Sequence, residues 1–147
     1  MKHLNRILFL LAAVLLSGCQ KDESEAERVA HQWGDAYFNY NFRQALNYVT
    51  PESERWLRFA ASNVTQQDLD VLQKNGQATV TLDGYYAGSD TTGTAYLNVS
   101  NWLRTDSIGR AGSHQELVSL QVLLVKRDGR WLVRMEGLPR NERQSRD

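Results

Sequence analysis

The single cysteine, Cys19, is the side chain in this sequence whose chemistry is easiest to predict. A cysteine thiolate is a nucleophile, and the two residues before it, Ser17 and Gly18, are small enough for an extended backbone to enter a protease cleft. Because no second cysteine exists, a disulfide within the chain or a cluster of thiolate metal ligands is excluded. Covalent modification of Cys19 is therefore the chemistry we expect.

The residues before Cys19 predict a secretion signal. Two positive charges near the start precede residues 7–16, which contain no polar side chain. A membrane-spanning helix needs about 20 apolar residues, so this run suits a cleaved signal. Leu16-Ser17-Gly18-Cys19 resembles the lipobox of bacterial lipoprotein precursors. That resemblance implies removal of residues 1–18 and a membrane anchor made of fatty acid chains, such as palmitate, on Cys19.

Residues 19–24 form a polar tether between the anchor and the folded domain. Cys19-Gln20-Lys21-Asp22-Glu23 is similar to the export signal of Bacteroidetes lipoproteins, which implies the outer membrane and display on the cell surface. Alternatively, the tether is only a spacer that holds the domain away from the bilayer, and the protein faces the periplasm.

Length and charge limit the possible functions. Removal of residues 1–18 leaves 129 residues, which is enough for one domain with one core. The same cleavage leaves 15 basic against 17 acidic side chains, and no basic stripe is present. This balance argues against a nucleic-acid partner. Residues 139–147 alternate basic and acidic side chains, and we expect a disordered tail there.

The first half of the domain has a helical pattern. Ser24 and Glu27 have the spacing of a capping box, and Gly34 costs this helix about 1 kcal/mol relative to alanine, for which a close approach of another backbone is one reason. Thr50 is the expected cap of a later helix that begins at Pro51, and residues 65–72 suggest a short capped turn. The apolar positions of the first helix are Ala26, Val29, Ala30, Trp33, Ala36, Tyr37 and Tyr40.

After Gly76 the apolar period changes to two, which predicts strands. Turn residues at 88–93, at 107–112 and at Asp128-Gly129 separate four such segments, and residues 117–125 are apolar enough for a central strand. Helices followed by hairpin-linked strands predict an α+β fold, in which N-terminal helices pack against an antiparallel sheet of about four strands.

The order of these segments resembles the nuclear transport factor 2-like, or cystatin-like, superfamily, and in particular its small uncharacterised bacterial lipoproteins. The resemblance covers residues 25–138 and depends on the long first helix, the segment Phe42-Arg43-Gln44-Ala45-Leu46, the Thr-Pro-Glu start at residue 50, and the hairpin at residues 124–133. It implies a strongly curved sheet wrapped around the first helix, which together form a cone whose mouth often holds a pocket.

Enzymes of that superfamily place an acid or base beside a tyrosine in the pocket. A carboxyl against an apolar wall and a hydroxyl donor in reach would suit an isomerase or hydratase. Asp35 and His31 lie off the apolar stripe, where a solvated face is the ordinary expectation, and His114 begins a strand after a turn. Tyr37 and Tyr40 lie on the stripe, where they fill the core with their hydroxyl groups at its rim.

The chain has four tryptophans and six tyrosines, which can line a binding surface or fill a core. Trp33, Trp56 and Trp131 have the pattern of core residues. Trp102 is the one we expect to be exposed, where it could form an aromatic platform for a sugar or a peptide with Tyr85 and Tyr86. The candidate ligand-binding residues are therefore Tyr37, Tyr40, Tyr85, Tyr86 and Trp102.

No metal-ligand spacing, phosphate-binding loop or nucleophile elbow is present, so we expect neither a metal nor a cofactor. The sequence favours a membrane-anchored, non-catalytic module that binds a small ligand or an envelope protein. A small cone-fold enzyme of isomerase or hydratase type is the alternative. A buried carboxyl beside a tyrosine would favour the enzyme.

Overall fold

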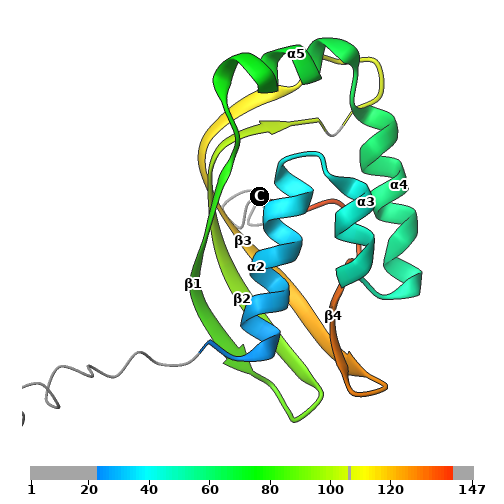
Figure 1. Cartoon of the computed structure of the whole chain (residues 1–147), viewed down its shortest axis with the longest axis vertical. Coiled ribbons are helices and arrows are strands. Elements are labelled where there is room, and N and C mark those ends of the chain that lie inside the picture. The colour runs from blue at the N-terminus through cyan, green and yellow to red at the C-terminus, as the bar shows by residue number, and fades with distance from the viewer. Residues whose placement is uncertain (1–22, 106, 141–147) are drawn as a thin grey trace, which may run out of the picture.

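The computed structural model describes residues 23–105 and 107–140, which form four helices and one four-stranded antiparallel sheet (Figure 1). The α-helices are α2 (Glu25–Phe38), α3 (Phe42–Ala45), α4 (Glu54–Asn63) and α5 (Gln66–Asn75), with 3-10 turns η2 (Leu46–Tyr48) and η3 (Pro51–Ser53) between α3 and α4. The strands are β1 (Thr79–Ala87), β2 (Thr92–Arg104), β3 (Ser113–Arg127) and β4 (Arg130–Arg134). The predicted α+β class is confirmed.

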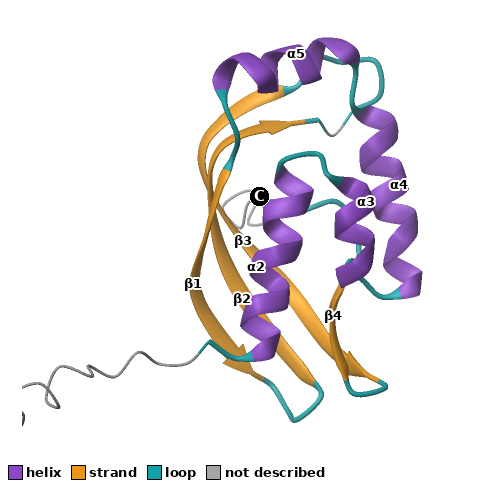
Figure 2. Cartoon of the chain, in the orientation of Figure 1, coloured by secondary structure: helices purple, strands orange, loops and turns teal. Residues whose placement is uncertain are grey.

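The strands follow chain order across the sheet, β1-β2-β3-β4, because each is joined to the next by a hairpin connection. The β3–β4 hairpin turns at Asp128 and Gly129, which both have the positive φ that this two-residue turn requires. Segment 117–125 lies in β3, which pairs with β2 on one side and with β4 on the other. Helices α2, α3 and α4 lie on the concave side of the sheet, and α5 lies across one end of it (Figure 2).

Two local irregularities accompany the curvature of the sheet. The β1–β2 register shifts between Leu82 and Gly84, so Asp83 lies in a bulge that bends β1. In β2, Asn101 adopts a left-handed φ of 56°. With these bends, the sheet wraps around α2 (Figure 1).

Helix α2 runs through the middle of the molecule and supplies much of its core. Ser24 and Glu27 form the predicted capping box, with the Ser24 amide 2.8 Å from the Glu27 carboxylate. A Cβ on Gly34 would come within 3.0 Å of the side chains of Leu97 and Val80, so this glycine lets the helix approach the sheet. The close neighbour expected from the sequence is therefore side chain, from β1 and β2, and not another backbone.

Each outer edge of the sheet has a backbone group that bonds a residue outside the strands. On β1, Nε2 of His31 lies 3.0 Å from the Val80 carbonyl oxygen, and the Asn39 amide accepts from the Ala78 N–H at 2.8 Å. On β4, the Thr50 N–H donates to the Val133 carbonyl oxygen at 3.0 Å. The Thr50 hydroxyl bonds the Ser53 hydroxyl instead of capping a helix amide, which corrects the expected role of Thr50.

Helix α5 closes one end of the curved sheet (Figure 1). The sequence suggested only a short turn here, whereas the structure has a ten-residue helix with a Thr65–Asp68 capping box. Oδ1 of Asp68 also accepts from the Gly112 N–H at 2.9 Å. At the other end of the helix, the Asn101 amide donates to the carbonyl oxygens of Asn75, Gly76 and Gln77 at 3.1–3.3 Å.

The predicted signal, Cys19 and most of the tether lie outside the described residues, as do residues 141–147 of the predicted tail. Within residues 23–105 and 107–140, no helix has the length and apolar character needed to cross a membrane.

Candidate functional site

A cavity of about 440 Å³ lies between the inner face of β3 and the segment that follows β4. Trp33 and Phe38 of α2 line it from the helix side, residues 120–123 line it from β3, and residues 133–140 form the remaining wall. This volume is within the range of small-ligand pockets. Pro139 and Arg140, which the sequence assigned to the tail, belong to this wall.

The cavity exists because β4 is much shorter than β3. The ladder between them starts at the Arg127–Arg130 pair and ends where Leu123 faces Arg134, although β3 continues back to Ser113. After Arg134 the chain leaves β3, and the Met135 N–H donates to the Ser53 hydroxyl at 2.8 Å on the outer side of β4, where the Val133 carbonyl oxygen also accepts from Thr50. The space that a longer β4 would fill is left beside Leu120 and Val122.

Most of the cavity wall is apolar, with a polar rim. Leu120, Val122 and Val133 are each less than 4% exposed and present hydrocarbon surface. Arg134 and Glu136 form an ion pair at 3.4 Å, and more than half of each side chain is exposed. At that exposure the pair is worth little to stability. The arrangement suits a ligand with an apolar body.

Trp33 lines this wall and carries a buried polar group that is closed off from solvent. The residue is 2% exposed, and its indole Nε1 has no hydrogen-bond partner among the described residues. The ring stacks on Tyr37 with centroids 5.0 Å apart and meets Phe38 edge to face. A buried donor without an acceptor costs about 1–3 kcal/mol. A ligand that brings an acceptor, such as a carbonyl, would offset that cost.

Trp56 Nε1 and the side-chain amide of Asn63 share this condition. Neither residue lines the cavity. Trp33 is therefore the residue at which an unsatisfied donor and a ligand-sized space coincide.

Tyr37 and Tyr40 lie beside a second, much smaller space of about 10 Å³, which is too small for a ligand. Tyr37 is buried in the aromatic cluster, and the Tyr40 hydroxyl donates to the Leu103 carbonyl oxygen. The pKa of Tyr40 is raised to about 12, chiefly by burial; a hydrogen bond with Thr105 lowers it, and the negative charge of Asp68 raises it by a smaller amount. Tyr40 is therefore a structural hydrogen-bond donor at neutral pH.

The predicted aromatic platform of Trp102, Tyr85 and Tyr86 does not form. Trp102 is only 4% exposed and packs edge to face on Phe38, with centroids 4.9 Å apart, so its expected exposure is wrong. Tyr85 pairs with Ala95, which lies seven residues, or roughly 23 Å, from Trp102 along β2. Tyr86 is 68% exposed and, as the next residue, lies on the opposite face from Tyr85. Regular alternation in β2 buries the odd-numbered residues 93–99 and would place Trp102 outside, but the positive φ of Asn101 interrupts the alternation and both Trp102 and Leu103 are buried.

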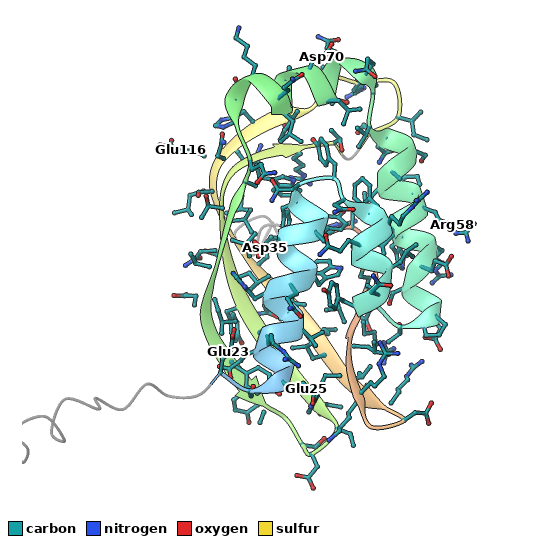
Figure 3. The ribbon with its side chains drawn as sticks, in the orientation of Figure 1. Glu23, Glu25, Asp35, Arg58, Asp70 and Glu116 are labelled. Carbon is teal, nitrogen blue, oxygen red and sulfur yellow. The ribbon has the colours of Figure 1, made fainter. Side chains whose placement is uncertain are left out.

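The acid and base candidates are not in the cavity. Asp35 is exposed on α2 and lies 3.7 Å from Nδ1 of His31, whose other ring nitrogen contacts β1. His114 is exposed and bonds the Asn101 side chain at 2.8 Å. Other charged side chains, including Arg58, Asp70 and Glu116, point away from the molecule (Figure 3). None of these three candidates faces an apolar wall beside a tyrosine hydroxyl.

Asp68 is a buried carboxylate near a tyrosine, and so it is the closest match to the enzyme criterion. Desolvation would raise its pKa, but hydrogen bonds from the backbone amides of Thr65 and Gly112 and from the Thr65 hydroxyl lower it overall. Both carboxylate oxygens accept hydrogen bonds, so Asp68 is ionised and serves as the cap of α5. A general acid needs the opposite pKa shift.

Among the described residues, no group of three or more His, Cys, Asp and Glu side chains could hold a metal ion. The residues that form the cavity were predicted only as core or strand positions. The one pattern in the sequence that could have revealed it is the unequal length of the last two apolar segments, since the final strand is too short to cover its neighbour.

No protein-family model matches the chain, and no curated protein matches it. A SEC-C motif-containing protein from Rhodopseudomonas palustris aligns in structure with a TM-score of 0.47 and 14% identity, over 80% of this chain and 78% of its own. An NTF-2-like protein of unknown function from Shewanella oneidensis aligns with a TM-score of 0.40 and 10% identity, over 72% of this chain and 88% of its own. Membership of the nuclear transport factor 2-like superfamily stays a prediction from the sequence.

Proposed function

We propose that this protein is a membrane-anchored, non-catalytic module that binds a ligand in the cavity between β3 and residues 133–140. The observation that supports it is the coincidence of a 440 Å³ apolar cavity with the buried, unsatisfied indole N–H of Trp33. The ligand class that fits has an apolar body and one hydrogen-bond acceptor.

A fluorescent probe with both features, anilinonaphthalene sulfonate, tests the cavity. Gly137 is suited to blocking it, because it lines the cavity and a Cβ there would meet nothing within 4 Å. We expect the probe to bind the wild type and Gly137→Ala and to bind Gly137→Phe at least about tenfold more weakly, since a phenyl ring takes ligand volume. Equal binding to all three proteins would remove the cavity from the proposal.

The anchor is the second part of the proposal and rests on the lipobox at Leu16-Ser17-Gly18-Cys19. Intact-protein mass spectrometry of the membrane fraction should show a chain that begins at Cys19 and carries the added mass of fatty acid chains. Cys19→Ser should lack that mass and appear in the soluble fraction. An unlipidated wild-type chain would contradict the anchor without affecting the cavity.

We further propose the outer membrane as its location, with the domain on the cell surface. The support is the similarity of residues 19–23 to a surface-export signal. External protease added to intact cells should then degrade the domain. Degradation only after lysis would assign it to the periplasmic side.

A further inference from the structure

The edge of β3 that faces the cavity carries backbone groups with no strand partner. From Ser113 to Val122, β3 pairs with β2 alone, because β4 pairs only with residues 123–127. In an antiparallel sheet, successive residues direct their N–H and C=O groups to opposite sides. The groups on the open side therefore belong to every second residue.

The register identifies those residues. The Lys126 N–H donates to the Thr91 carbonyl oxygen, so even-numbered residues of β3 bond toward β2. The β2–β3 register has no shift along its length, so this alternation holds back to the start of the strand. The N–H and C=O groups of Leu117, Ser119 and Gln121 point to the open edge, spaced about 6.6 Å apart.

On each outer edge of the sheet at least one strand carbonyl oxygen has a partner from outside the sheet: Val80 contacts His31, and Val133 accepts from Thr50. Within the described residues, neither a helix side chain nor another backbone bonds the open groups of β3. Segment 113–122 also lacks the lysines and prolines that usually protect exposed edges, and Glu116 is its one acidic or basic side chain other than His114.

The chemistry of such an edge fits an extended polypeptide, because alternating N–H and C=O groups at strand spacing match another strand. We propose that the natural ligand is an extended peptide segment of a partner protein, which adds to β3 in the place that a longer β4 would occupy. Its side chains opposite Leu120 and Val122 face inward, so one large apolar side chain enters the cavity. The inference rests on the proposed function, since it specifies what the cavity binds.

The test uses the full-length protein in detergent and a library of blocked seven-residue peptides, in which threonine alternates with randomised positions. We expect binders that carry a large apolar residue at one inward position. Two variants of the strongest binder are then made, one methylated at the backbone nitrogens of its odd-numbered residues and the other at those of its even-numbered residues. We expect one of these two phases to weaken binding at least about tenfold and the other to have little effect, since only one edge of the peptide donates to β3. Equal effects of the two phases would overturn the proposal.

Ser119 provides a matched pair of variants. Its hydroxyl bonds the Asn98 side chain at 2.8 Å, and both Ser119→Ala and Ser119→Pro remove that bond. Proline alone removes the N–H at the open edge, where strands tolerate it. We expect a loss of at least about tenfold in peptide affinity for Ser119→Pro and less than about twofold for Ser119→Ala. If Ser119→Pro does not fold, the comparison of the two methylated peptides still tests the proposal.

Two further outcomes separate this inference from its alternatives. If anilinonaphthalene sulfonate binds the cavity but no peptide binds, the peptide proposal fails and the proposed function stands. If the protein is a dimer that Ser119→Pro converts to monomers while Ser119→Ala does not, a second copy of this chain occupies the edge and the peptide proposal is overturned.

Discussion

The end of the sheet that α5 closes and the cavity beside β3 differ in whether their polar groups have hydrogen-bond partners. At the end closed by α5, the Asp68 carboxylate accepts three hydrogen bonds and the Asn101 amide donates to three carbonyl oxygens. At the cavity, the indole N–H of Trp33 has no acceptor within the described part of the chain. The side chains of Asp68 and Asn101 have their hydrogen-bond partners without a ligand, whereas the Trp33 N–H does not. Mutations at the closed end should therefore change stability, whereas mutations at the cavity should change ligand binding.

The largest expected effect is on stability at the closed end. Asp68→Ala leaves the amides of Thr65 and Gly112 without their acceptor and should lower the free energy of unfolding by about 2–4 kcal/mol. Asp68→Asn keeps the shape and one oxygen and should cost less. Urea unfolding measures both, and probe binding to the cavity should remain in the fraction that is folded. A fully stable Asp68→Ala protein would contradict this role for Asp68.

The same carboxylate predicts a pH dependence. Because hydrogen bonds lower its pKa in the folded state, ionised Asp68 stabilises the fold above its unfolded value, near 3.8. That contribution is lost as the pH falls below 3.8 and through the folded pKa. The stability difference between wild type and Asp68→Asn should therefore shrink on acidification in this window. A difference that stays constant with pH would show that Asp68 does not titrate as proposed.

Asn101 should have the next largest effect. Asn101→Asp keeps a residue type that tolerates a positive φ but replaces the donor to the carbonyl oxygens of residues 75–77 with an acceptor. We expect a loss of about 1–3 kcal/mol, measured by urea unfolding, together with faster amide hydrogen exchange in α5. Unchanged exchange in α5 would show that Asn101 does not hold this helix.

Tyr40→Phe should have a smaller effect, since it removes one hydrogen bond to the Leu103 carbonyl oxygen and no ring packing. We expect a loss of about 1 kcal/mol. Its raised pKa has a separate signature: tyrosinate absorbance should show one group titrating near pH 12 that is absent from the variant. Because the folded pKa is raised, this contribution is present below the ordinary value of 10.0 and is lost as the pH rises through about 12.

The smallest stability effect is expected at the cavity, where binding should respond instead. Gly137→Phe should change the free energy of unfolding by less than about 0.5 kcal/mol, because the new side chain has open space. Binding of anilinonaphthalene sulfonate should nevertheless weaken at least about tenfold. A large destabilisation by Gly137→Phe would mean that the cavity wall is packed as tightly as the closed end.

The fold was predictable from local patterns, because caps, turn residues and apolar periods each act within a few residues. The box at Ser24–Glu27 and the turn at Asp128–Gly129 are examples. The cavity was not predictable in the same way. It depends on where β4 ends relative to β3 and on the path of residues 135–140, which starts at a bond between Met135 and Ser53, 82 residues apart in the sequence. The exposure of Trp102 was wrongly predicted because the alternation of β2 changes phase at Asn101, whose positive φ the apolar pattern does not reveal.

The most direct test of the central claim is the indole N–H resonance of Trp33 in a nitrogen-15 correlation spectrum. Four tryptophans give four indole peaks, and Trp33→Phe assigns the relevant one. On addition of saturating anilinonaphthalene sulfonate, the account predicts that the Trp33 peak moves downfield as its donor gains an acceptor, and that Gly137→Phe abolishes the change. A Trp33 peak that stays fixed while the probe binds would contradict the assignment of this cavity as the ligand site.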